Sequence, residues 1–266
     1  MGFFRTILRI LDIQMKVPQI YGWFHILFLL LTAGLTVFAI RRGRKHDEKT
    51  ICRVVFWISV VVFILEAYKQ INYTFGDGSG TPKYLWYAFP WQYCSTPMYI
   101  GLLTGVFRRG KIHRALCAYL SSYCIFAGVA VMFYPAMVFI ETVGINIQTM
   151  VCHGAMVVVG GYLLGSGHVK LEPRTLLWAM PVFVSCMLVA SVLNRIAHDH
   201  GLTTFNMFFI SPYVECELPV YSLVHDVLPF PLNWLAYLLG FTAAAGAMLL
   251  IAYGIKRFCQ RKAAIR

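Results

Sequence analysis

Hydrophobic residues in this chain gather into long blocks that are separated by short polar stretches. An α-helix rises about 1.5 Å per residue, so roughly 20 apolar residues are enough to cross the hydrocarbon layer of a membrane. Backbone polar groups in lipid must pair within their own segment, so each block is predicted to be a helix. Seven blocks are recognisable: Gly22–Ile40, Ile51–Ile71, Trp91–Phe107, Ala115–Ile140, Ile145–Gly165, Leu176–Asn194 and Leu232–Gly254.

The third block is the least regular of the seven. Its beginning, "FPWQYCSTPMYIGLL", has Gln92 and Cys94 at positions where lipid-facing residues are expected. Pro97 follows and removes a backbone donor from the first turns. We therefore expect a short, irregular helix that carries polar groups to membrane depth.

The pattern predicts an all-α, polytopic membrane protein with seven transmembrane helices in one domain, residues 22–254. An amphipathic interfacial helix is expected over 1–21, since the apolar residues of "MGFFRTILRILDIQMK" share one helical face. A basic tail covers 255–266. Composition supports this class: 59% of the residues are hydrophobic, 13% are charged and the mean hydropathy is +0.67, whereas soluble domains carry about 25% charged residues.

The basic residues predict an orientation. Most Lys and Arg residues flank alternate connections between the seven blocks, which places those connections in the cytoplasm by the positive-inside rule. The N-terminus is then extracytoplasmic or lumenal, and the C-terminus is cytoplasmic. Short juxtamembrane clusters suit anionic lipid headgroups, and no nucleic-acid-binding motif accompanies them. The flanking residues are Arg41, Arg42, Arg44, Lys45, Lys49, Arg53, Arg108, Arg109, Lys111, Arg114, Lys170, Arg174, Lys256, Arg257, Arg261, Lys262 and Arg266.

Cofactor and metal signals are weak. The eight cysteines form no CxxC pair, and a disulfide framework is not expected because most of them fall inside the blocks. His198, Asp199 and His200 are adjacent, and neighbouring positions rarely give good metal geometry without further ligands. We predict neither a cofactor nor a resident metal.

Polar residues concentrate towards one end of the predicted helices, the extracytoplasmic end in this orientation. Ionisable groups at membrane depth are costly and usually face a cavity or one another, which marks functional sites. The sequence therefore predicts a polar pocket open to the extracytoplasmic or lumenal side. Its candidate residues are Glu66, Lys69, Gln70, Asn72, Gln92, Cys94, Glu141, Asn146, Gln148, His153, Asn194 and Arg195.

Two of these residues have the chemistry of a nucleophile and its base. Cys94 lies about 6 Å and His153 about 12 Å below the predicted starts of their helices. A helix N-terminus favours a thiolate, and an imidazole can take the thiol proton and return it to a leaving group. Thr149 or Asn146 would orient the ring. A packing cysteine and a structural histidine fit the same spacing, so the residues alone leave both readings open.

Three stretches carry a resemblance: "PWQYCSTPMYIGLLTGVF", "INIQTMVCHGAMVVVGGYLL" and "LNRIAHDHGLTTFNMFFISP". Together they resemble the YwaF-type integral membrane family, which includes eukaryotic phospholipid acyltransferases that use a cysteine and a histidine. The resemblance covers most of the chain. It implies catalytic roles for Cys94 and His153, and it aligns family positions with Asn194, Asn206 and Pro212.

The activity implied by the resemblance is acyl transfer between phospholipid and lysophospholipid through a cysteine thioester. Gln92, Asn194 or backbone N–H groups would stabilise the oxyanion. Lipid headgroups would lie near Lys69 and Arg195, and Glu66 and Asn206 complete the predicted pocket. The segment 195–231 is too short and proline-rich to span and is expected to cover the pocket.

Two alternatives from other classes remain open at this point. The same pocket would serve a transporter or receptor for a small polar or lipid ligand. In a structural membrane protein, the polar residues would only join helices to one another.

Overall fold

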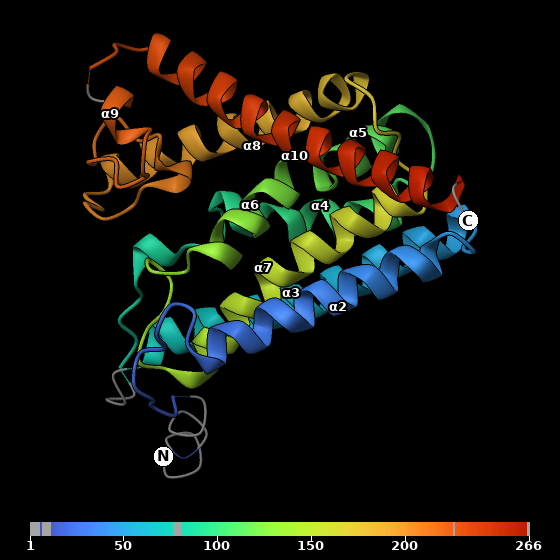
Figure 1. Ribbon diagram of the computed structural model, residues 1–266. Helices are drawn as coiled ribbons and strands as arrows, with labels where there is room; N and C mark the ends of the chain where they lie inside the picture. Colours follow the sequence, from blue (N-terminus) through green and yellow to red (C-terminus); the bar gives the residue numbers. More distant parts are fainter. Residues whose placement is uncertain (1–5, 7–11, 77–80, 226, 265–266) are drawn as a thin grey trace.

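The computed structural model describes Thr6 and residues 12–76, 81–225 and 227–264 (Figure 1). The described chain is helical and contains no β-strand. Its α-helices are α2 (Trp23–Gly43), α3 (Glu48–Phe75), α4 (Thr96–Val106), α5 (Gly110–Leu120), α6 (Tyr123–Phe133), α7 (Val143–Gly165), α8 (Arg174–Asp199), α9 (Ser222–His225) and α10 (Leu232–Ala264). Three short 3₁₀ turns are η1 (Trp86–Ala88), η2 (Tyr93–Ser95) and η3 (Met207–Phe209).

Among the described residues, six helical segments are long and apolar enough to cross a membrane. They are Trp23–Gly43, Glu48–Phe75, Gly110–Phe133, Val143–Gly165, Arg174–Asp199 and Leu232–Arg261. The segment Gly110–Phe133 consists of α5 and α6, which meet at Ser121 and Ser122. The two serine hydroxyls donate to carbonyls of the preceding turn of α5. Six of the seven predicted blocks are thus confirmed as segments of spanning length.

The third predicted block differs from the prediction. Within 91–107 the structure has η2 and the 11-residue α4, and a helix of that length is only about 16 Å long. Pro97 lies in the first turn of α4 and favours a helix start there. The seven spanning helices predicted from the sequence are therefore six spanning segments and one short helix.

The short helix lies beside the first half of α3. A Cβ on Gly101 or Gly105 of α4 would meet Ser59 or Phe56 of α3, so the backbones of the two helices approach closely. The chain before α4 runs along the second half of α3, because Gln70 donates to the carbonyl of Ala88 at 2.9 Å. The polypeptide thus returns along α3 partly as irregular chain and partly as α4.

Helix α7 lies between α2 and α6 and also packs on α3 (Figure 1). Glycines permit the contact with α2: a Cβ on Gly154 would meet Thr32, and one on Gly161 would meet Thr36. Small residues at such seams let membrane helices approach and gain van der Waals contact. Large apolar side chains on the outer faces remain exposed, as expected for a surface covered by lipid, among them Leu30, Phe38, Trp57, Leu177, Val192 and Leu250.

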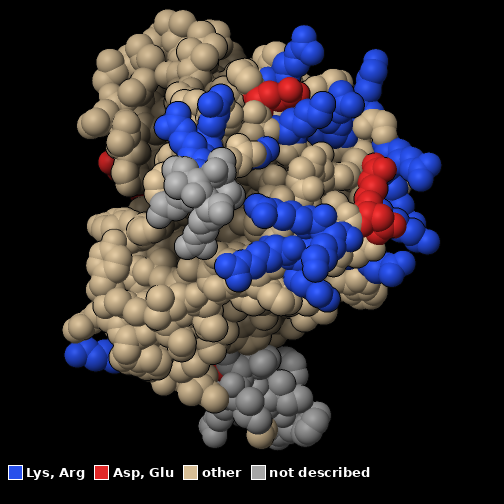
Figure 2. All heavy atoms as spheres, turned by 45° about the vertical axis from the view of Figure 1, so that its right-hand side comes forward, with Lys and Arg blue, Asp and Glu red and all other residues tan. Residues whose placement is uncertain are grey.

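One end of the bundle gathers the basic residues, and we call it the charged end. Here the α2–α3 turn meets the end of α7, since Gly43 lies against Tyr162 and Ser166. The C-terminal part of α10 borders the α7–α8 turn, because Lys170 and Glu172 of the turn and Tyr253 of α10 line one surface hollow. Figure 2 shows many Lys and Arg side chains together on this part of the molecule. Connections that alternate along the sequence therefore come together in space, as the charge pattern predicts.

The N-terminal segment differs from the predicted amphipathic helix over part of its length. Residues 1–5 and 7–11 lie outside the described chain. Residues 12–21 contain no helix. Gln14 forms an isolated antiparallel bridge with Thr142, and the N–H of Met15 donates to the carbonyl of Glu141 at 2.6 Å. This segment binds the connection before α7, and those hydrogen bonds require extended backbone.

The seam between α6 and α7 gives a stability prediction. A Cβ on Gly128 would lie 2.7 Å from the carbonyl oxygen of His153 and 2.9 Å from the Cβ of Met156. Gly128→Ala should lower the free energy of unfolding by about 1–3 kcal/mol, because overpacking forces the two helices apart. The matched control is Gly34→Ala, since nothing lies within 4 Å of a Cβ at that position. Denaturant unfolding in detergent measures both; equal stabilities for the two variants would contradict the close seam.

Candidate functional site

Cys94 lies in η2, directly before α4, and is half-buried. Its side chain lines a cavity of about 20 Å³ together with Ile58 of α3, Met98 of α4, Leu120 of α5 and Cys152 of α7. That volume holds about one water molecule. Because Ile58 lies near the middle of α3, the thiol lies deeper in the bundle than the sequence predicts. The irregular return of the chain along α3 places it there.

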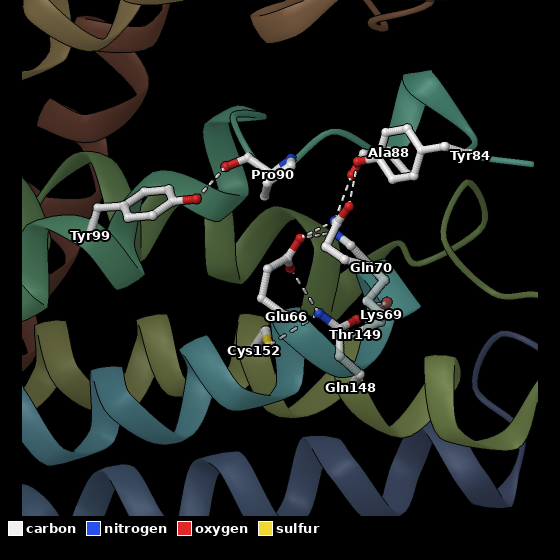
Figure 3. Close-up of polar contacts among 10 residues, drawn as sticks. All are labelled: Glu66, Lys69, Gln70, Tyr84, Ala88, Pro90, Tyr99, Gln148, Thr149 and Cys152. Carbon is white, nitrogen blue, oxygen red and sulfur yellow. Dashed lines mark hydrogen bonds and ion pairs between the residues drawn. The ribbon is translucent and has the colours of Figure 1, made fainter. Parts of the chain in front are cut away.

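A buried carboxylate organises the polar groups beside this cavity (Figure 3). Glu66 of α3 is 5% exposed. Its Oε1 accepts from the ammonium of Lys69 and from the amide of Gln70, both at 2.7 Å. Its Oε2 accepts from Gln148 of α7 at 3.3 Å. We call these four residues the polar cluster; they satisfy a charge that would be costly at membrane depth.

The polar cluster also holds the chain that leads to Cys94. Besides its bond to Ala88, Gln70 accepts a very short hydrogen bond from the hydroxyl of Tyr84. Tyr99 of α4 donates to the carbonyl of Pro90 at 3.0 Å (Figure 3). Segment 84–90 is therefore anchored both to α3 and to α4.

Cys152 connects the polar cluster to the cavity. Gln148 donates to its Sγ at 3.5 Å, and Cys152 lines the cavity beside Cys94. The charges of Lys69 and Glu66 act on both thiols. Two cysteines and an ion pair thus share one part of the bundle.

His153 is 5% exposed and adjoins Cys152 on α7. Its Nδ1 lies 2.7 Å from the carbonyl oxygen of Thr149. A carbonyl only accepts, so Nδ1 carries the hydrogen and Nε2 bears a lone pair. Nε2 is buried and has no hydrogen-bond partner among the described residues. No hydrogen bond joins it to Cys94 in this structure, and His153 is not among the residues that line the cavity at Cys94. An unpaired buried acceptor is nevertheless uncommon in proteins.

Thr149 and Asn146 were the two residues predicted to orient the His153 ring, and in the structure only Thr149 does so. Thr149 orients the His153 ring, through its backbone carbonyl rather than its hydroxyl. Asn146 instead binds both backbone groups of Ile140, at 2.6 and 2.9 Å. It stabilises the connection that enters α7.

Three of the predicted site residues have amides that bind backbone in the segment 205–215. Gln92 donates to the carbonyl of Asn206 at 2.9 Å and accepts from the N–H of Phe208 at 3.0 Å. Asn194 binds both backbone groups of Met207, at 2.7 and 3.0 Å. Asn206 accepts from the N–H of Ser211 at 3.0 Å. These amides hold the segment instead of pointing into the cavity beside Cys94.

Segment 205–215, which these amides hold, packs over the residues that precede η2. Phe208 and Phe209 have positive φ angles of 61° and 57°, which strain non-glycine residues and persist where the surroundings enforce them. Ring contacts join Phe208 to Tyr93 at 5.7 Å and Phe205 to Phe89 at 5.3 Å. The aromatic side chains of this segment therefore cover residues 89–93, next to Cys94.

Arg195 and the adjacent His-Asp-His run belong to a surface arrangement. Arg195 is exposed and pairs with Asp199 at 3.0 Å and with the hydroxyl of Tyr213 at 2.9 Å. The ring of His198 stacks on Tyr213 at 3.8 Å. Since Asp199 is engaged by Arg195 and His198 by an aromatic ring, these residues do not converge on one point as metal ligands would.

The structure thus brings the polar cluster, Cys94 and helix α7 to one region, whereas Gln92, Asn194, Asn206 and Arg195 bind other parts of the chain. Cys152 was not among the predicted pocket residues. Its spacing of four from Gln148, one helical turn on the same face, was the available signal.

Comparison with known proteins gives one family. The sequence model described as the TMEM164 family matches residues 20–253. No curated protein and no solved structure matches the chain.

Substitutions at Asn194 and Arg195 test whether the amide of Asn194 stabilises segment 205–215. Asn194→Leu should lower the free energy of unfolding by about 2–4 kcal/mol, because each unpaired buried backbone group of Met207 costs about 1–3 kcal/mol. Arg195→Ala, one residue away and exposed, should stay within about 0.5 kcal/mol of the wild type. Thermal unfolding in detergent distinguishes them. If the hydrogen bonds between Asn194 and Met207 did not contribute to stability, the two variants would be equally stable.

Proposed function

The chain belongs to the TMEM164 family, and we propose that it is a membrane-embedded acyltransferase that moves fatty acyl groups between phospholipid and lysophospholipid through a thioester on Cys94. The observation that carries this proposal is the setting of Cys94: a half-buried thiol that lines a cavity inside an apolar helical bundle, beside a buried ion pair. The resemblance to YwaF-type acyltransferases at the same cysteine supports it.

The proposed reaction uses the thiol of Cys94 and the ring of His153. The Cys94 sulfur attacks the ester carbonyl of a phospholipid acyl chain while its proton passes to the Nε2 of His153, which then protonates the departing lysolipid oxygen. A second lysolipid hydroxyl attacks the thioester, gives its proton to the same nitrogen, and the thiol is regenerated. The hydrogen bond from Nδ1 to Thr149 keeps Nε2 as the acceptor. Hydrogen bonds between catalytic groups often tighten only when substrate is bound.

In this proposal the polar cluster binds the polar parts of the substrate, the phosphate and the oxyanion. Lys69 is the cation whose charge acts on Cys94, and it suits a lipid phosphate. Gln148 donates to Glu66 and, at 3.5 Å, to the sulfur of Cys152, which lines the cavity. We propose its amide as the oxyanion donor because it lies beside the cavity and its bonds are long, whereas the amides of Gln92 and Asn194 hold the 205–215 segment. Preorganised donors of this kind are a major source of rate enhancement.

Substrate entry requires the bundle to open, since a cavity of about 20 Å³ is far smaller than an acyl chain. The apolar cavity wall between α3 and α4, formed by Ile58 and Met98, suits the chain itself. The aromatic segment 205–215, which covers residues 89–93, is the part we propose to move.

Acyl exchange in liposomes tests the activity. Protein supplied with labelled phospholipid and unlabelled lysophospholipid should produce labelled acceptor lipid. Cys94→Ser should reduce the rate to background, and His153→Ala should lower it by about 10²–10⁴-fold, the usual contribution of general acid–base catalysis. Mass spectrometry of the wild type should find a hydroxylamine-sensitive acyl group on Cys94.

Cys186→Ser is the matched control, a buried cysteine of α8 outside the cavity, and it should retain the wild-type rate. Exchange that persists in both the Cys94 and the His153 variants would reject the enzyme and leave a ligand-binding or structural protein.

We also propose that the charged end faces the cytoplasm, as the positive-inside rule indicates, with the N-terminus on the opposite side. Cys259 of α10 reports on this. It is the exposed member of the eight cysteines, all of which are described. A membrane-impermeant maleimide should label Cys259 only after intact cells are permeabilised, and Cys259→Ser should abolish the labelling. Labelling of intact cells would reverse the orientation.

A further inference from the structure

Two histidines and two cysteines meet near the charged end. Cys52 comes from the first turns of α3, His113 and Cys117 from α5, and His168 from the α7–α8 turn. Potential ligand atoms of His113, Cys117 and His168 all lie within 4.8 Å of one another. Cys52, His113 and Cys117 are buried and His168 is half-buried, so the group is shielded but borders a turn. None of these residues lines the cavity at Cys94.

One atom, the Nε2 of His113, lies at the centre of the group. It is 2.8 Å from the Nε2 of His168, 3.4 Å from the Sγ of Cys117 and 3.8 Å from the Sγ of Cys52. The Nδ1 of His113 lies 2.8 Å from the carbonyl oxygen of Phe107 and must donate to it. The Nε2 atom therefore has a single lone pair, which one donor saturates, while three groups approach it.

This arrangement has the features of a metal-ligand set. A histidine that binds a metal usually donates its other ring nitrogen to a carbonyl or carboxylate, as His113 does to Phe107. Its spacing of four from Cys117 puts both residues on one face of α5. Cysteine and histidine together are the ligands preferred by zinc in four-coordinate sites.

The three distances from the Nε2 of His113 can be compared with those of tetrahedral zinc. Cys52 is not part of the set whose ligand atoms all lie within 4.8 Å of one another, so its side chain would have to move closer to complete the site. Zn–N bonds of about 2.0–2.1 Å and Zn–S bonds of about 2.3 Å place neighbouring ligand atoms about 3.3–3.8 Å apart. The two sulfur–nitrogen distances, 3.4 and 3.8 Å, already lie in this range. The two imidazole nitrogens, at 2.8 Å, would separate by about 0.5 Å.

We propose that Cys52, His113, Cys117 and His168 bind one Zn²⁺ ion as a structural site. Binding would release two thiol protons, and two thiolates with two neutral imidazoles make a site without net charge, which suits a buried position. Four protein ligands leave no open coordination position, which is typical of structural zinc. The ion would join the start of α3, the middle of α5 and the α7–α8 turn.

Metal analysis of the purified protein tests the site. Tag-free protein, reconstituted with Zn²⁺ and washed with a weak chelator, should retain about one zinc per chain. Co²⁺ in place of Zn²⁺ should give the visible spectrum of a tetrahedral site with thiolate-to-cobalt charge transfer. Cys117→Ser and His168→Gln should each lower the zinc affinity by more than about 100-fold, since outer partners of ligands alone contribute about 10–100-fold.

The double variant His198→Gln/His200→Gln is the matched control, because it removes the two histidines of the surface run and should leave both the zinc content and the cobalt spectrum unchanged. Wild-type protein that retains no zinc, or whose cobalt spectrum lacks thiolate charge transfer, would overturn the proposal and leave a hydrogen-bonded histidine pair. Both measurements on the wild type are informative even where a variant fails to fold, and neither depends on the Cys94 activity.

Discussion

The buried carboxylate of Glu66 is the interaction on which the arrangement around Cys94 depends. A carboxylate in a membrane-spanning helix is costly unless every oxygen has a partner. Lys69 and Gln70 from the next turn of α3, with Gln148 from α7, supply those partners. Gln70 in turn binds the chain before α4. One charge thus connects two spanning helices and the segment that carries the thiol.

A second set of polar contacts holds the opposite side of that segment. Gln92 and Asn194 satisfy backbone groups of the 205–215 segment, which therefore stays folded over η2 despite the positive φ angles of two phenylalanines. Cys94 lies between two anchored stretches of irregular chain. Irregular backbone at membrane depth is tolerated only where protein surrounds it or it lines a cavity, and both conditions are met here.

Cysteines and histidines occur in two separate parts of the bundle. On α7, the ring of His153, next in sequence to the cavity-lining Cys152, leaves a buried nitrogen without a partner among the described residues. Towards the charged end, the ring of His113 has more approaching groups than its one lone pair accepts. We propose proton transfer at the first ring and cation binding at the second. The same residue types therefore support different chemistry because their surroundings differ.

Six spanning segments and the charge asymmetry were predictable from the sequence, because a membrane helix satisfies its own hydrogen bonds and its length and apolarity are local properties. Cys94 and His153 were identifiable as candidates for the same reason: polar residues stand out in apolar blocks. A short and irregular third helix was predicted from Pro97 and the polar residues beside it. That α4 is too short to span was not predicted, since the returning chain before it is held by Gln70 and Tyr84. Likewise, only the tertiary structure decided that the amides of Gln92 and Asn194 bind backbone, and that Cys52, His113 and His168 meet. Such contacts depend on how distant helices rotate and pack, which no local pattern records.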